Sequence, residues 1–62
     1  MDGYWVVHLK VDATITELDF GRDCHHIDWA KDSWRFQRVK EGETLTIIPK
    51  ENILYVEWRE ER

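Results

Sequence analysis

The chain has few of the residues that stabilise small proteins through disulfides and tight turns. Among its 62 residues there is one cysteine, Cys24, so a disulfide within the chain is excluded. One proline and three glycines give few turn signals, and the loops are therefore expected to be short. No apolar run approaches the roughly 20 residues of a membrane-spanning helix, and the start lacks the basic segment of a secretory signal. The sequence therefore predicts a cytoplasmic protein with no membrane contact.

Tryptophan is the residue that the chain holds in surplus. Four are spread along it, namely Trp5, Trp29, Trp34 and Trp58. A domain of this size buries only about 60% of the surface of its unfolded chain, so dense aromatic packing and self-association are the available sources of stability. Because tryptophan combines a large apolar area with a polar N–H, it serves in cores and at binding surfaces alike. Some of the four are therefore expected to face a partner.

Short alternating stretches predict β-strands joined by short turns. The expected strands cover residues 4–11, 14–20, 25–30, 34–39, 44–48 and 53–58. The second stretch alternates imperfectly, which indicates a bulge or a bend, and a short helix from Thr14 is its alternative interpretation. Residues 12–13, 21–23, 31–33 and 41–42 are expected to be turns, and residues 50–52 a tight connection of one 3₁₀ turn at most. Residues 1–3 and 59–62 are expected to fray.

Five or six short strands at spacings of roughly ten residues are typical of a small sandwich or barrel. The sequence predicts one all-β domain over residues 1–62, an antiparallel barrel or sandwich of five to six strands and of the size of SH3 and Sm domains. Residues 48–56, Ile-Pro-Lys-Glu-Asn-Ile-Leu-Tyr-Val, resemble the closing strand–turn–strand of Sm-like and SH3-like barrels. The resemblance covers nine residues and points to no one family.

The alternation separates the tryptophans into two groups. Trp5 lies on the apolar face of the first strand and Trp34 shares a face with Phe36, so both are expected in the core. Trp29 stands beside a polar turn, and Trp58 stands beside the charged end of the chain. These two are therefore the tryptophans expected to reach an interface.

The last two strands also show an apolar face each. Leu45 and Ile47 share a face of residues 44–48. Leu54 and Val56 share a face of residues 53–58, and Trp58 continues it.

The net charge of −4 is unevenly distributed along the chain. Residues 33–40 hold three bases and no acid, whereas the segments on either side are acidic. A nucleic-acid-binding domain is usually basic, so nucleic acid is not the expected partner. The run Trp34-Arg35-Phe36-Gln37-Arg38 nevertheless interleaves aromatic and cationic residues as single-strand binders do. A small barrel that binds single-stranded nucleic acid is therefore the alternative function.

One cluster has the residue types of a zinc site. In a strand, Cys24, His26 and Asp28 share a face, and His8 from a neighbouring strand is the candidate fourth ligand. Structural zinc sites use two separated pairs of ligands in loops or helical turns, and the chain lacks that spacing. We therefore favour a polar turn with a small buried cysteine, and no metal or cofactor is expected.

Catalytic chemistry is not expected either. Adjacent residues in a strand point to opposite faces, so Cys24 and His25 do not form a local pair of nucleophile and base. The chain has no glycine-rich loop to bind an oxyanion or a phosphate, and its size leaves little room for a substrate pocket.

The sequence as a whole favours a non-enzymatic interaction module. We expect it to self-associate as a homodimer and to bind another protein, as a regulator or inhibitor of a larger protein of the viral or mobile-element type. The aromatic surplus, the small core and the segregated charge support this hypothesis. The residues expected to contact a partner are Tyr4, Trp5, Trp29, Arg35, Arg38, Tyr55 and Trp58.

Overall fold

A computed structural model of the chain describes residues 2–10 and 14–61. The predictions made for Met1, for Val11 in the first strand, for the Asp12-Ala13 turn and for Arg62 lie outside the described residues. Within the described ranges, no helix has the length and apolar character needed to cross a membrane.

The described residues fold into six strands and two 3₁₀ turns, so the all-β prediction is confirmed. In chain order they are β1 (Gly3–Leu9), β2 (Glu17–Leu18), η1 (Phe20–Arg22), β3 (His26–Trp29), β4 (Ser33–Gln37), β5 (Thr44–Pro49), η2 (Lys50–Asn52) and β6 (Ile53–Glu60). They form two antiparallel sheets of three strands each, ordered β2-β1-β6 and β3-β4-β5. No ladder joins the two sheets within this part of the chain, so they do not close into one continuous sheet.

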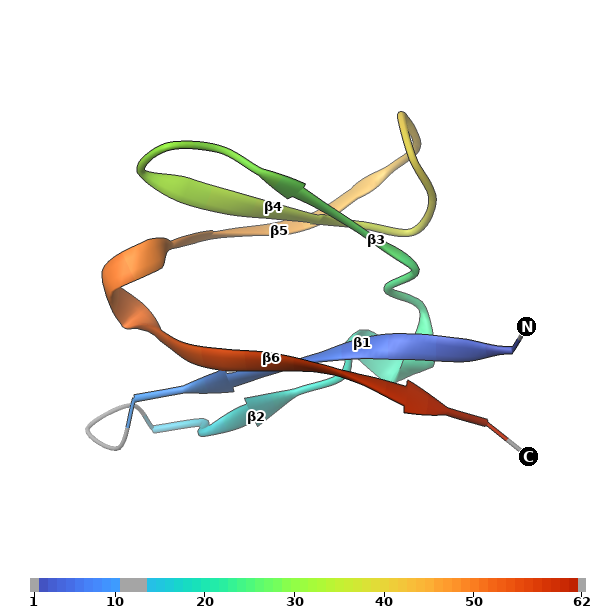
Figure 1. Ribbon diagram of the computed structural model, residues 1–62, viewed down its shortest axis with the longest axis horizontal. Coiled ribbons are helices and arrows are strands. Elements are labelled where there is room, and N and C mark those ends of the chain that lie inside the picture. Colours follow the sequence, from blue (N-terminus) through green and yellow to red (C-terminus); the bar gives the residue numbers. More distant parts are fainter. Residues whose placement is uncertain (1, 11–13, 62) are drawn as a thin grey trace.

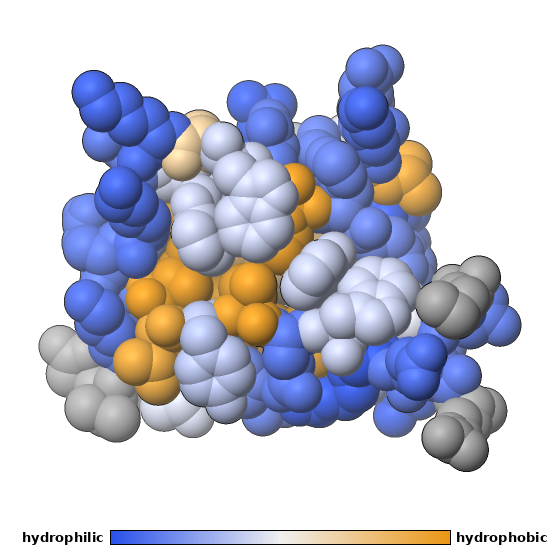
Figure 2. Space-filling view, in the orientation of Figure 1, coloured by the Kyte–Doolittle hydropathy of each residue, from blue (hydrophilic) through white to orange (hydrophobic). Residues whose placement is uncertain are grey.

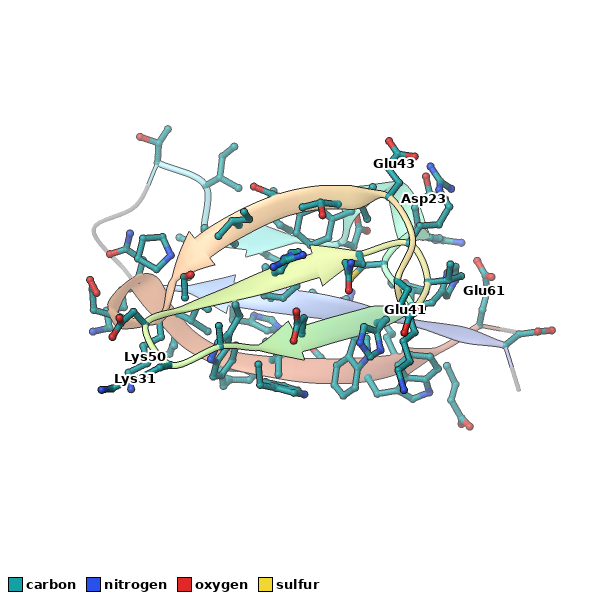
Figure 3. The ribbon with its side chains drawn as sticks, turned by 90° about the horizontal axis from the view of Figure 1, so that it is seen from above. Asp23, Lys31, Glu41, Glu43, Lys50 and Glu61 are labelled. Carbon is teal, nitrogen blue, oxygen red and sulfur yellow. The ribbon has the colours of Figure 1, made fainter. Side chains whose placement is uncertain are left out.

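The two sheets lie one above the other (Figure 1). The η2 turn carries the chain from β5 to β6 at one end, and the segment through η1 carries it from β2 to β3 at the other. Strands β3 and β6 lie along the same side of the molecule, whereas β2 and β5 lie along the opposite side (Figures 1 and 3). We call the side between the edges of β3 and β6 the open side.

The core lies between the sheets and is centred on β1 and β4. It consists of Val7, Cys24, Ile27, Phe36, Ile48 and Ile53. Side chains on the outer face of β1 are buried as well. Val6 and Val7 both have no exposed surface, and Tyr4 is 5% exposed. The outer face of β1, which alternates less cleanly in the sequence, is therefore buried as well.

The segment from Thr14 to Phe20 forms neither the long strand nor the helix considered for it. Only Glu17 and Leu18 form a strand, and the chain then turns through η1. Phe20, Gly21 and Arg22 all have left-handed backbone angles, with φ of 53°, 65° and 70°. The Asp19 carboxylate accepts a hydrogen bond from the Gly21 N–H at 3.0 Å, which stabilises the turn. The prediction of at most one helical turn is therefore wrong, because η1 adds a second.

Two β-bulges overturn the faces expected for the last two strands. In β5 the register shifts opposite Phe36, so that Leu45 packs against the core while Ile47 is 57% exposed. In β6 the register shifts by one residue next to Tyr55, so that Ile53 is buried while Leu54 is 57% exposed. An extra residue in a strand moves each side chain beyond it to the opposite face of the sheet.

The two ends of the chain pair with each other further than expected. Gly3 pairs with Glu60, and the Glu61 N–H donates a hydrogen bond to the Asp2 carbonyl at 3.1 Å. The side chain of Arg59 is held by two carboxylates. Residue 3 and residues 59–61 are therefore part of the sheet or bonded to it, although the sequence predicts fraying there.

Candidate interaction surface

The four tryptophans form a continuous row, the tryptophan row (Trp34, Trp29, Trp5 and Trp58). Trp29 pairs with Trp34 across β3 and β4, with ring centroids 4.4 Å apart. Trp29 also meets Trp5 of the other sheet at 6.4 Å, and Trp5 meets its cross-strand partner Trp58 at 5.3 Å. All three contacts are edge-to-face, a geometry that contributes about 0.5–1.5 kcal/mol per pair beyond the buried area. The row thus joins the two sheets, between which the described residues form no backbone ladder.

The row is buried unevenly. Trp5 and Trp34 are half-buried and pack against the core, as the alternation predicts. Trp29 is 54% exposed and Trp58 is 38% exposed. Figure 2, which looks onto the open side, shows aromatic and apolar side chains gathered in the middle of the face and hydrophilic ones along its margins. An apolar centre with a polar rim is the composition of a protein-binding surface.

The two tyrosines of the expected contact set lie away from the row. Tyr4 is buried on the outer face of β1, where the guanidinium of Arg22 lies 5.7 Å from the ring centroid. Tyr55 is 51% exposed and stacks on the ring of His8, with centroids 4.2 Å apart. The structure therefore brings together Trp5, Trp29 and Trp58 from that set and separates both tyrosines from them.

The two arginines of the set lie on and just after β4 of the other sheet, and they already have acidic neighbours. Arg35 of β4 lies 3.8 Å from Asp28 of β3. Arg38 lies 3.2 Å from Asp23 and 3.7 Å from Glu43. Such exposed pairs contribute little to stability, but they neutralise the cations that a phosphate backbone requires.

A network of charged side chains covers the outer face of the sheet β2-β1-β6. His8 Nε2 donates to a carboxylate oxygen of Glu57 at 2.6 Å. Arg59 donates to the same Glu57 oxygen at 2.8 Å and to Glu17 at 3.3 Å. The hydrogen bond from His8, followed by that from Arg59, lowers the pKa of Glu57 below its ordinary value. This network is not among the sequence-based expectations, although Glu57 and Arg59 share one face of a strand and thus carried a signal for it.

The candidate metal ligands are not brought together. Cys24 is fully buried in the core, where its thiol donates to the His26 carbonyl at 3.5 Å and burial raises its pKa. His8 lies on the outer face of the other sheet, bonded to Glu57. In residues 2–10 and 14–61, no three His, Cys, Asp or Glu side chains are grouped as metal ligands.

Charged side chains lie at both ends of the molecule. Asp23, Glu41, Glu43 and Glu61 lie at the end that holds η1 and the last residues of β6 (Figure 3). Lys31 and Lys50 lie together at the opposite end (Figure 3). Arg22 lies 3.1 Å from Glu61 and Arg38 lies 3.2 Å from Asp23, so the first of these ends holds charges of both signs.

Comparison with known protein families, with curated protein sequences and with solved structures finds nothing that matches this chain.

Proposed function

We propose that this chain is a non-enzymatic interaction module that binds protein through the tryptophan row on its open side. The observation that carries the proposal is the half-exposure of Trp29 and Trp58 in a row whose other two members pack against the core. Aromatic side chains held in place by their neighbours lose little entropy on binding, and tryptophan is enriched among the residues that dominate binding energy.

We infer that the scaffold of this module is a partly open barrel of SH3-like size. The two crossings at η1 and η2 lie at opposite ends of the facing sheets, which supports this interpretation (Figure 1). Such a scaffold holds the exposed rings on strands, and a site built on strands is more rigid than one built on loops.

The alternative of single-stranded nucleic acid has less support. Trp34 and Phe36 of the aromatic and basic strand pack in or against the core, so their rings are not free for base stacking. Arg35 and Arg38 have carboxylates within 4 Å. The net charge of −4 opposes phosphate binding as well. We therefore propose protein, and not nucleic acid, as the ligand.

The proposal is tested by affinity capture with the tagged chain, from a lysate of the native host and from a solution of the untagged chain. Trp29→Ala and Trp58→Ala are expected to lower the amount of captured protein roughly tenfold, the loss typical of a central aromatic contact. Ile47→Ala is the matched control, because Ile47 is equally exposed but points away from the core on the other sheet. Folded tryptophan variants that capture the same proteins as the wild type would overturn the proposal.

A further inference from the structure

Strand β6 presents an unpaired edge on the open side. In the order β2-β1-β6 it is an outer strand, and among the described residues it forms a ladder with β1 alone. It runs for eight residues, Ile53–Glu60. An outer strand offers a row of free backbone N–H and C=O groups to another extended chain. Leu54, Tyr55 and Trp58 add exposed apolar surface along it.

The hydrogen bonds of β1 show which of its residues direct their backbone N–H and C=O groups away from β6. The Trp5 N–H donates to the Cys24 carbonyl at 2.7 Å, and the Leu9 N–H donates to the Thr16 carbonyl at 2.8 Å. Both acceptors lie on the side of β1 opposite to β6. In an antiparallel pair such residues face a partner with which they exchange no hydrogen bond. Trp5 and its partner Trp58 are therefore such a pair.

It follows that every second residue of β6 has its backbone groups on the free edge. The backbone N–H and C=O groups of Trp58 point to the free edge, and by alternation those of Val56 and Glu60 do so as well. The backbone groups of Glu57 and Arg59 point toward β1. The Glu61 N–H follows the same alternation, since it donates to the Asp2 carbonyl at 3.1 Å.

We propose that this edge pairs with the same edge of a second copy of the chain, antiparallel and about a two-fold axis at Trp58. The inference rests on the proposed function, because it names the protein that the open side binds. A symmetric contact of this kind uses one surface twice and closes after two copies. The N–H and C=O groups of Val56, Trp58 and Glu60 form about six hydrogen bonds between the two strands.

Charge complementarity and the β-bulge together favour this register over those centred on Glu57 and Val56. An axis at Glu57 sets that carboxylate directly opposite its own copy, which is unfavourable. An axis at Val56 sets Trp58 opposite Leu54, which is the extra residue of the β-bulge and lies outside the regular pairing. An axis at Trp58 uses the regular part of the strand. It places Glu57 opposite Arg59 of the second copy, and the symmetry repeats this pair of opposite charges.

The pairing also places the two open sides against each other. The joined strands make one sheet of six strands, β2-β1-β6 with its symmetric copy. Strand β3 lies on the same side as β6, so the β3 edges of both copies then face each other above the joint (Figure 1). Trp29, at 54% exposure, and Trp58, at 38%, become covered by the second copy. The contact thus buries the two tryptophans that are partly exposed to solvent in the single chain.

The edge pairing is tested by sedimentation equilibrium of the full chain over a wide range of concentrations, with circular dichroism as the check of folding. The wild type is expected to dimerise. Glu60→Pro removes an outward N–H from an exposed residue, at a position where an edge strand tolerates proline, and is expected to weaken the dimer at least roughly tenfold. Glu60→Gln is its matched control and keeps the N–H, so it is expected to dimerise like the wild type.

Two charge variants test the register. Glu57→Lys and Arg59→Glu each set like charges opposite across the joint, and each alone is expected to weaken the dimer roughly tenfold. An equimolar mixture of the two variants sets the introduced lysine opposite the introduced glutamate and is expected to recover a mixed dimer. Association that the mixture does not restore would overturn the axis at Trp58.

The outcomes separate the pairing from the proposed function. A folded wild type that is monomeric at every concentration, or a dimer that Glu60→Pro leaves unchanged, overturns the pairing. If that monomer still captures a host protein and Trp58→Ala abolishes the capture, the proposed function stands without the pairing. If Trp29→Ala and Trp58→Ala have no effect on any capture, both fail.

Discussion

Gly3 lies directly against the indole ring of Trp58. A β-carbon on Gly3 would be 2.6 Å from Cζ2 of that ring and 2.8 Å from its Nε1. The two residues are on the paired strands β1 and β6. The missing side chain of Gly3 thus makes the space that the last ring of the tryptophan row occupies.

Gly3→Ala is expected to push the Trp58 ring outward and to destabilise the fold by about 1–3 kcal/mol, the usual cost of overpacking. Tryptophan fluorescence is expected to shift to longer wavelength, because the ring becomes more hydrated. Gly21→Ala is the matched control. Gly21 has a φ of 65°, and nothing lies within 4 Å of the position of an added β-carbon. Backbone strain alone is therefore expected to destabilise the Gly21→Ala variant, by about 1 kcal/mol. An unchanged emission maximum in Gly3→Ala would contradict the contact.

Truncation of the paired residues Trp34 and Trp29 is expected to lower the free energy of unfolding by different amounts. Trp34 packs against the core, so Trp34→Ala is expected to destabilise by about 3–5 kcal/mol. Trp29 is 54% exposed, so Trp29→Ala is expected to lose little more than its ring contacts, about 1–2 kcal/mol. Urea unfolding measures both, under dilute conditions in which the chain is a monomer. Equal losses would contradict the assignment of Trp34 to the core side of the row and of Trp29 to its exposed side.

The depressed pKa of Glu57 predicts a loss of stability in acid. The hydrogen bond from His8, and then that from Arg59, favour the carboxylate in the folded chain. A group whose pKa is lower in the folded state binds fewer protons there, so its contribution is present above its ordinary pKa of 4.5 and is lost as the pH falls through the folded value. The urea midpoint is therefore expected to fall from about pH 5 downward.

Glu57→Gln is the control for this dependence, since the amide does not titrate. The variant is expected to be less stable than the wild type at neutral pH, and the gap is expected to narrow in acid. Glu17, the second carboxylate near Arg59, remains in both proteins. If both proteins lost stability in parallel with falling pH, the network around Glu57 would not be the source.

The thiol of Cys24 is expected to be unreactive in the folded chain. The residue has no exposed surface, and burial raises its pKa, so little of the reactive thiolate forms near neutral pH. An aromatic disulfide reagent is expected to label it slowly in buffer and rapidly in urea. Labelling at the same rate in both conditions would show that the core around Cys24 opens readily.

Local alternation was enough to predict most of the strands and the division of the tryptophans. Trp5 and Trp34 pack against the core, and Trp29 and Trp58 are more exposed, as the pattern of their neighbours indicates. The facing of Ile47 was not predictable in this way. One unpaired residue in β5 reverses it, and the alternation of a single strand contains no sign of its partner's register.

The turn at η1 and the tryptophan row depend on contacts between distant segments. Three consecutive left-handed residues at 20–22 include Phe20, a residue type that rarely adopts that conformation, so its identity suggests a strand instead. Trp29 meets Trp5 only because the sheets stack at that point. Strand order and stacking are long-range properties, and no short window of sequence encodes them.

The most direct measurement of the central claim, that the open side binds a second copy of the chain, follows the four indole N–H resonances by ¹⁵N NMR as the chain is concentrated. We expect the signals of Trp29 and Trp58 to shift together, with the amides of Val56 and Glu60, while amides around Ile47 stay in place. Shifts confined to the region of Ile47 or to other surfaces, with all four indole signals constant, would contradict it.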